Sequence, residues 1–167
     1  MTIKDLTPSV VWNNFYGITR IPRPSKHEEK IRQYLLDWGK AHNIEAFTDK
    51  TGNVIMRVPA TPGYENRKGV VLQGHMDMVP QKNSDSTHDF LNDPIETRVE
   101  GEWLKACGTT LGADNGLGVA LALAVAESPE VKHGPIEILV TYDEETGMTG
   151  AEALEPGILK GDILINL

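Results

Sequence analysis

The spacing of apolar residues predicts two helices at the start of the chain. Ser25 and Glu28 have the sequence of a capping box, in which two side chains satisfy each other's free backbone N–H groups at the first turn of a helix. Apolar residues recur every three or four positions, as on the buried face of a helix. They are Val10, Val11, Phe15 and Ile18 in the first helix, capped near Thr7-Pro8-Ser9, and Ile31, Tyr34, Leu35 and Trp38 in the second.

The rest of the chain shows mainly strand signals. Residues 44–48 and 54–58 flank a Lys-Thr-Gly-Asn turn and predict a hairpin, and residues 95–99 and 103–106 predict a second one. Helices alternating with apolar strands indicate an α/β sandwich. The other predicted elements are buried strands at 69–76, 136–142 and 163–167, a buried helix at 117–127 and a short helix beginning at 150–154. Because the chain ends in a predicted core strand without a polar tail, we expect a truncated domain.

Composition narrows the class of protein. The 167 residues are enough for about one domain, and 40% hydrophobic with 24% charged residues is typical of a soluble globular protein. We expect no membrane association, because no apolar run is long enough to cross a bilayer. The net charge of −8 argues against nucleic acid as a partner. A single cysteine, Cys107, and no signal-peptide pattern favour the cytoplasm.

His75 and Asp77 lie at the end of a predicted buried strand. Strand side chains alternate, so both project from the same face. Imidazole is a common zinc ligand, and a neighbouring carboxylate can fix its tautomer and raise its basicity. A His-x-Asp pair taken alone is nonetheless more often structural.

Asp114 precedes the predicted buried helix in a turn with three glycines, Gly112, Gly116 and Gly118. An aspartate at this place is often a simple helix N-cap. The glycines, however, suggest close backbone approach or unusual dihedral angles, and a carboxylate held there could reach two cations. The spacing is not that of a nucleotide-binding loop.

Three carboxylates, Asp143, Glu144 and Glu145, follow the strand at 136–142. Such a run is usually a solvated turn. Here it follows a strand that we expect to be buried, and open α/β sheets place their sites at the carboxyl ends of their strands. Because adjacent side chains point in different directions, one glutamate could bind a metal while its neighbour faces the substrate water.

These three segments together predict a metal site at one edge of the sheet. Oxygen ligands with limited imidazole suit Zn, Mn or Co. One cysteine cannot form a cysteine-based zinc site, and no Gly-x-Ser-x-Gly sequence indicates a serine nucleophile.

The sequence resembles a known family over nearly its whole length. The segments VVLQGHMDMVPQ, GTTLGADNGLGVALALA and ILVTYDEETGMTGA are similar to those of the aminoacyl-histidine dipeptidases (peptidase D, carnosinase-like). That family belongs to a larger group of two-metal peptidases that includes aminoacylases and glutamate carboxypeptidases. The resemblance implies a zinc-peptidase-like catalytic domain, with a central mixed β-sheet flanked by helices, of which residues 1–167 are the N-terminal part.

The resemblance also implies a role for each candidate residue. His75 would bind one metal, Asp114 would bridge two and Glu145 would bind the second. Glu144 would be the general base and Asp77 would orient His75. The cofactors would be two divalent ions, zinc by first expectation, with cobalt or manganese as alternatives. Two further ligands of the family, an acidic residue expected directly after residue 167 and a late histidine, have no counterpart here, nor has the lid domain.

The predicted activity is metal-dependent hydrolysis of dipeptides, of the Xaa-His type such as β-alanyl-histidine, by the complete protein. We expect the 167 residues alone to be inactive. The predicted partner is a small peptide substrate, and a homodimer is expected for the full-length protein. Two alternatives stay open: an N-acyl-amino-acid hydrolase of the same group, and a non-catalytic metal-binding fragment.

Overall fold

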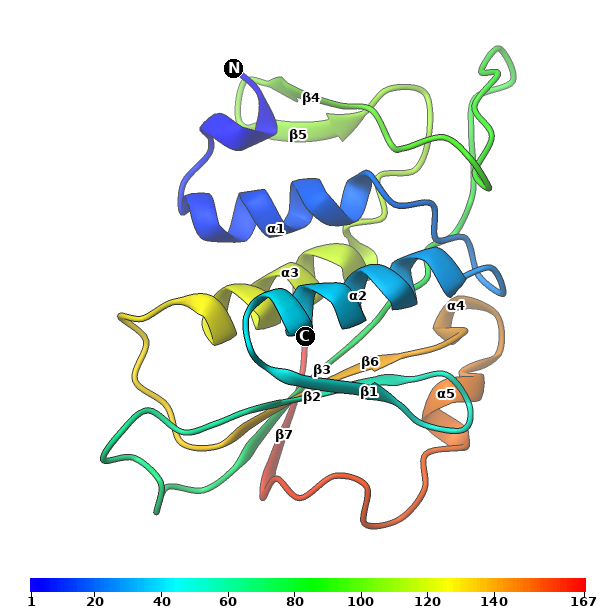
Figure 1. The fold of residues 1–167 in the computed structure, drawn as a ribbon. Helices are drawn as coiled ribbons and strands as arrows, with labels where there is room; N and C mark the ends of the chain where they lie inside the picture. Colours follow the sequence, from blue (N-terminus) through cyan, green and yellow to red (C-terminus); the bar gives the residue numbers. More distant parts are fainter.

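A five-stranded mixed β-sheet forms the centre of the molecule in the computed structural model, which describes residues 1–167 (Figure 1). The strand order is β1-β2-β6-β3-β7. β3 pairs parallel with β6 and with β7, whereas β2 pairs antiparallel with β1 and β6. The strands are β1 (Glu45–Thr48), β2 (Val54–Val58), β3 (Val70–His75), β6 (Ile136–Thr141) and β7 (Ile163–Asn166). The predicted α/β fold with a central mixed sheet flanked by helices is confirmed.

Three helices lie on one side of this sheet: two pack directly on its strands, and the first packs mainly on the third (Figure 1). Their apolar residues join those of the strands in a core of 19 buried side chains, among them Leu35, Met56 and Leu123, which are fully buried. The apolar residues that recur every three or four positions in the sequence are the ones that lie on the buried faces of these helices. The helices are α1 (Ser9–Thr19), α2 (Glu29–Ala41) and α3 (Ala113–Glu127).

The opposite face of the sheet carries a much smaller apolar cluster. Ile55, Val71 and Leu139 are buried there, under side chains that come mainly from residues 154–159. The remaining elements lie around the sheet: a 3₁₀ turn (η1, Ile3–Asp5), the separate hairpin of β4 (Thr97–Glu100) and β5 (Trp103–Ala106), and the short helices α4 (Glu144–Gly147) and α5 (Thr149–Glu152). Both predicted hairpins are therefore present.

The predicted capping box at Ser25 and Glu28 is wrong. α2 begins at Glu29 and has no side-chain hydrogen bond at its N-cap. The Ser25 hydroxyl instead donates to Asp77 Oδ2 at 2.8 Å, and Glu28 Oε1 accepts the backbone N–H of Asp143 at 3.0 Å. Glu28 is fully buried, so its carboxyl group lies inside the protein instead of at an exposed helix end.

The last strand is also different from its prediction. β7 pairs only with β3 and forms an edge of the sheet. Its residues Ile163, Leu164 and Ile165 are 44–56% exposed, so this apolar segment is not a core strand within these 167 residues. No helix in the structure has both the length and the apolar character needed to span a membrane.

Candidate metal centre

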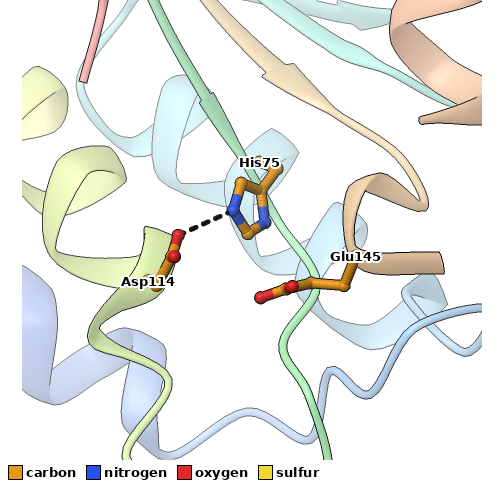
Figure 2. Close-up of side chains that lie close together, drawn as sticks. All are labelled: His75, Asp114 and Glu145. Carbon is orange, nitrogen blue, oxygen red and sulfur yellow. Dashed lines mark hydrogen bonds and ion pairs between the residues drawn. The ribbon is translucent and has the colours of Figure 1, made fainter. Parts of the chain in front are cut away.

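His75, Asp114 and Glu145 converge at the carboxyl-terminal edge of the sheet (Figure 2). Each contributes one potential ligand atom, and these atoms all lie within 4.8 Å of one another. His75 Nε2 and Asp114 Oδ1 are 2.9 Å apart. His75 is buried, whereas the Asp114 side chain is 82% exposed, so the cluster opens to solvent on the Asp114 side.

The pairing of β3 with β6 brings His75 and Glu145 together. These neighbouring strands are parallel, with His75 opposite Thr141. Their carboxyl ends therefore meet at the same edge of the sheet, where open α/β folds place their sites. Glu145 follows β6 in the first turn of α4, and Asp114 is brought in from the side by α3, which packs on β3.

Asp77 links the histidine to the two glutamates. Its fully buried carboxylate receives a hydrogen bond from His75 Nδ1 at 3.2 Å and from the backbone N–H groups of Glu144 and Glu145 at 3.1 and 3.2 Å. Burial by itself would raise the pKa of Asp77, but these bonds and the one from Ser25 bring it down to about 2. Asp77 therefore stays ionised and turns His75 Nε2 toward Asp114 and Glu145.

His75 lies between two carboxylates, Asp77 on Nδ1 and Asp114 on Nε2. Burial would lower its pKa, but the two hydrogen bonds outweigh burial and the pKa is raised. Because Nδ1 carries the hydrogen bonded to Asp77, Nε2 is the nitrogen that would bind a cation when the imidazole is neutral. When His75 is protonated, the proton on Nε2 occupies that position.

The three carboxylates after β6 have different surroundings. Asp143 is buried, and its side chain accepts hydrogen bonds from the hydroxyls of Thr146 and Thr149. Glu144 is partly exposed, with Oε2 3.8 Å from His75 Nε2. Burial raises the pKa of Glu145, and repulsion from Asp114 and other nearby carboxylates adds to the rise, against the attraction of His75.

The glycine-rich turn allows close approach, as its sequence suggests. Gly112 has a φ of +68°, in the left-handed region that favours glycine. A Cβ atom on Gly118 would lie 2.7 Å from Asn115 Oδ1. The Asp114 carboxylate bonds to His75 and to no backbone N–H group of α3, so the alternative reading of Asp114 as a simple N-cap is wrong.

Two polar residues of this region carry no signal in the sequence. Arg23 is buried and donates to the backbone carbonyls of Met76 and Asp77, at 3.2 and 2.9 Å, and to that of Gly112. Asn115 accepts the backbone N–H of His75 at 3.3 Å. Their partners are 40 or more residues away along the chain, so no local pattern could have identified them.

Comparisons with known proteins identify the family of this chain. Residues 71–165, more than half of the chain, match the peptidase family M20/M25/M40, and the chain belongs to that family. It is 52% identical over 164 residues to the cytosol non-specific dipeptidase of Escherichia coli strain K12. That match covers 98% of this chain and 34% of the relative.

Solved structures share the fold of this chain. The aminoacylhistidine dipeptidase of Vibrio alginolyticus is 58% identical, with a TM-score of 0.97 over 99% of this chain and 34% of that one. The Bacillus subtilis YXEP protein, described as a dinuclear metal-binding peptidase of the M20 family, is 16% identical with a TM-score of 0.50, over 81% and 35% of the two chains. At that identity the likeness shows the fold alone. The 167 residues thus span about a third of these relatives.

Proposed function

We propose that this chain carries part of the catalytic centre of a metal-dependent dipeptidase. The observation that carries the proposal is the orientation of His75, whose Nε2 faces the Asp114 and Glu145 carboxylates while Asp77 holds Nδ1. The names of the Escherichia coli and Vibrio alginolyticus relatives support dipeptides as substrates, and the clustered imidazole and carboxylate groups support bound metal.

The residues present fit divalent cations. An imidazole nitrogen and two carboxylates within 4.8 Å of one another are a donor set for zinc, manganese or cobalt. His75, Asp114 and Glu145 would hold the ions. When bound, such ions would lower the pKa of the attacking water and polarise the peptide carbonyl.

Glu144 would move the proton. Its carboxylate lies beside the histidine, 3.8 Å from Nε2, and is partly open to solvent. In this position it can accept a proton from the attacking water at a carboxylate oxygen and deliver it to the leaving amine. Asp77 would keep His75 and Glu144 in place, because its carboxylate accepts the imidazole N–H of His75 and the backbone N–H of Glu144.

The substrates would be dipeptides with a free N-terminus, of the Xaa-His type such as β-alanyl-histidine. This specificity follows the family resemblance of the sequence and the name of the Vibrio alginolyticus relative, whereas the Escherichia coli relative is named as a non-specific dipeptidase. A cytoplasmic location and a homodimer of the full-length protein remain predictions; the Escherichia coli relative is cytosolic by its name.

We further propose that residues 1–167 are the N-terminal part of the catalytic domain, inactive by themselves. The support is the coverage of about a third of the relatives and the three exposed apolar side chains of β7, which offer an unpaired edge to further chain.

Glu144→Gln in the complete protein tests the general base. The variant should keep its metal and lose turnover of β-alanyl-histidine by several orders of magnitude, because the amide cannot accept the proton. Near-normal turnover with bound metal would contradict the assignment. Glu152→Gln, an exposed glutamate in α5, is the matched control and should retain both metal and activity.

Asp114→Ala tests the metal site separately. Metal analysis of the dialysed variant should find the metal lost, whereas a full complement of metal would refute Asp114 as a ligand. Comparing unblocked dipeptides with N-acetyl amino acids as substrates then separates a dipeptidase from an N-acyl-amino-acid hydrolase.

A further inference from the structure

Arg23 joins two of the segments that form the metal centre. Its guanidinium donates to the carbonyl oxygens of Met76 and Asp77, next to His75, and to that of Gly112, two residues before Asp114. The backbone adds a further link, because the carbonyl of Arg23 accepts the N–H of Met78 at 3.1 Å. One side chain therefore spans the two segments, which are more than 30 residues apart in the sequence.

The space around Arg23 is shaped to its side chain. A Cβ atom on Gly112 or on Gly116 would lie 2.5 Å from Arg23 Nη2, too close for any real contact. Gly112, at the N-cap of α3, and Gly116, near the start of that helix, thus leave the room that the guanidinium fills. Arg23 itself is only 2% exposed, so its three hydrogen bonds face no competition from water.

Arg23 is a buried cation that makes no direct ion pair. Its hydrogen bonds go to carbonyl oxygens, and the negative charges that act on its pKa, against burial, are those of Asp77, Glu145 and Asp114. Burial lowers the pKa of Arg23 to about 10, so it remains charged at neutral pH. The planar guanidinium presents its donors in a fixed fork, which a lysine ammonium cannot reproduce.

We propose that Arg23 is a positioning residue of the metal centre, whose guanidinium sets the separation between the segment that carries His75 and the segment that carries Asp114. The proposal rests on the proposed function, since it assumes that these two residues hold metal. Arg23 acts through the backbone and touches no reacting atom.

The test compares Arg23→Lys with Arg20→Lys in the complete protein. Arg20 is a matched control, because it also donates to a backbone carbonyl, that of Ile95 at 3.2 Å, and binds Glu96 at 2.6 Å, and neither partner belongs to the metal centre. Titration of the metal-free protein with Co²⁺ is followed by its visible absorption spectrum, which reports the ligand geometry, and kcat and KM are measured on a dipeptide.

For Arg23→Lys we expect Co²⁺ affinity at least tenfold weaker, a changed spectrum, and a lower kcat with KM within about threefold. The control should match the wild type. A folded Arg23→Lys variant with wild-type Co²⁺ affinity and spectrum overturns the proposal, because a positive charge alone would then hold the two segments without the planar set of guanidinium donors. If this variant does not fold, Gly116→Ala replaces it: the added methyl displaces Nη2, and an unchanged Co²⁺ spectrum again overturns the proposal.

A wild-type protein that binds no Co²⁺ would refute the proposed function without deciding the role of Arg23. Hydrogen exchange of the metal-free protein then decides it. Faster exchange of residues 76–78 and 110–116 in Arg23→Lys supports the proposal that Arg23 holds these two segments together. Unchanged exchange in both segments overturns the proposal.

Discussion

Replacing Glu28 with glutamine is expected to remove a pH-dependent loss of stability. Glu28 is fully buried, and its Oε2 has no hydrogen-bond partner. The groups that face it are the carboxylates of Asp77 and Asp143 and the side chain of Tyr142. Burial above all, with the charge of Asp77, raises the pKa of Glu28 to about 7 from an ordinary 4.5, against the backbone hydrogen bonds that it accepts.

The sign of the effect follows from proton linkage. A raised carboxyl pKa means that the folded state binds the proton more tightly than the unfolded state does. Glu28 therefore costs no stability below pH 4.5, and stability falls as the pH rises from there to about 7. The difference between the two values corresponds to a loss of about 3 kcal/mol, as an upper value for a group that can relax.

Glutamine keeps the Oε1 acceptor for the Asp143 N–H and places a neutral amide where Oε2 has no partner. Urea unfolding of the metal-free protein at pH 5, 6, 7 and 8 would measure the difference in unfolding free energy between Glu28→Gln and wild type. This difference should shift in favour of the variant by about 2–3 kcal/mol between pH 5 and 8. For Glu29→Gln, the exposed neighbour, the difference in unfolding free energy from wild type should not change with pH. A difference that is also independent of pH for Glu28→Gln would refute a raised pKa of Glu28.

Three further variants test packing around the site by urea unfolding. Gly74→Ala should cost about 1–3 kcal/mol, because its methyl would overlap Asn115 Oδ1; unchanged stability would mean that Asn115 moves freely. Asn53→Ala should cost about 3 kcal/mol, since this fully buried side chain accepts the Tyr142 N–H at 2.9 Å and donates to Asp49 and Gly150; a loss below about 1 kcal/mol would contradict that. Leu35→Ala, on the buried face of α2, should cost about 2–5 kcal/mol, and unchanged stability would argue against the burial of Leu35.

Local patterns predicted most elements of the fold. The spacing of Phe15, Ile18, Ile31 and Leu35 predicts the faces of α1 and α2 that are buried, because helix geometry alone decides which side chains share a face. The predicted strands are present as well, because apolar runs bounded by turn residues indicate strands, but the last one, predicted to be buried, is an exposed edge strand. Local chemistry misled at Ser25 and Glu28, where a capping box was expected and long-range partners, Asp77 and Asp143, took both side chains.

The candidate site divides in the same way. His75, Asp114 and Glu145 could be proposed from the sequence because each follows or precedes a strongly apolar element, and parallel strands bring their carboxyl ends to one edge. The residues that hold them, Arg23 above all, could not, because a buried guanidinium bound to distant carbonyl groups leaves no periodic signal.

The sequence by itself therefore determined the elements, the family resemblance and the set of chemically able side chains. Only the tertiary structure decided their arrangement: that Asp77 receives the backbone N–H groups of Glu144 and Glu145 as well as His75, that Asp143 turns away to Thr146 and Thr149, and that β7 is an exposed edge. The physical reason is that burial and hydrogen-bond partners depend on contacts between segments far apart in the chain, whereas helix and strand periodicity depend on neighbours a few residues away.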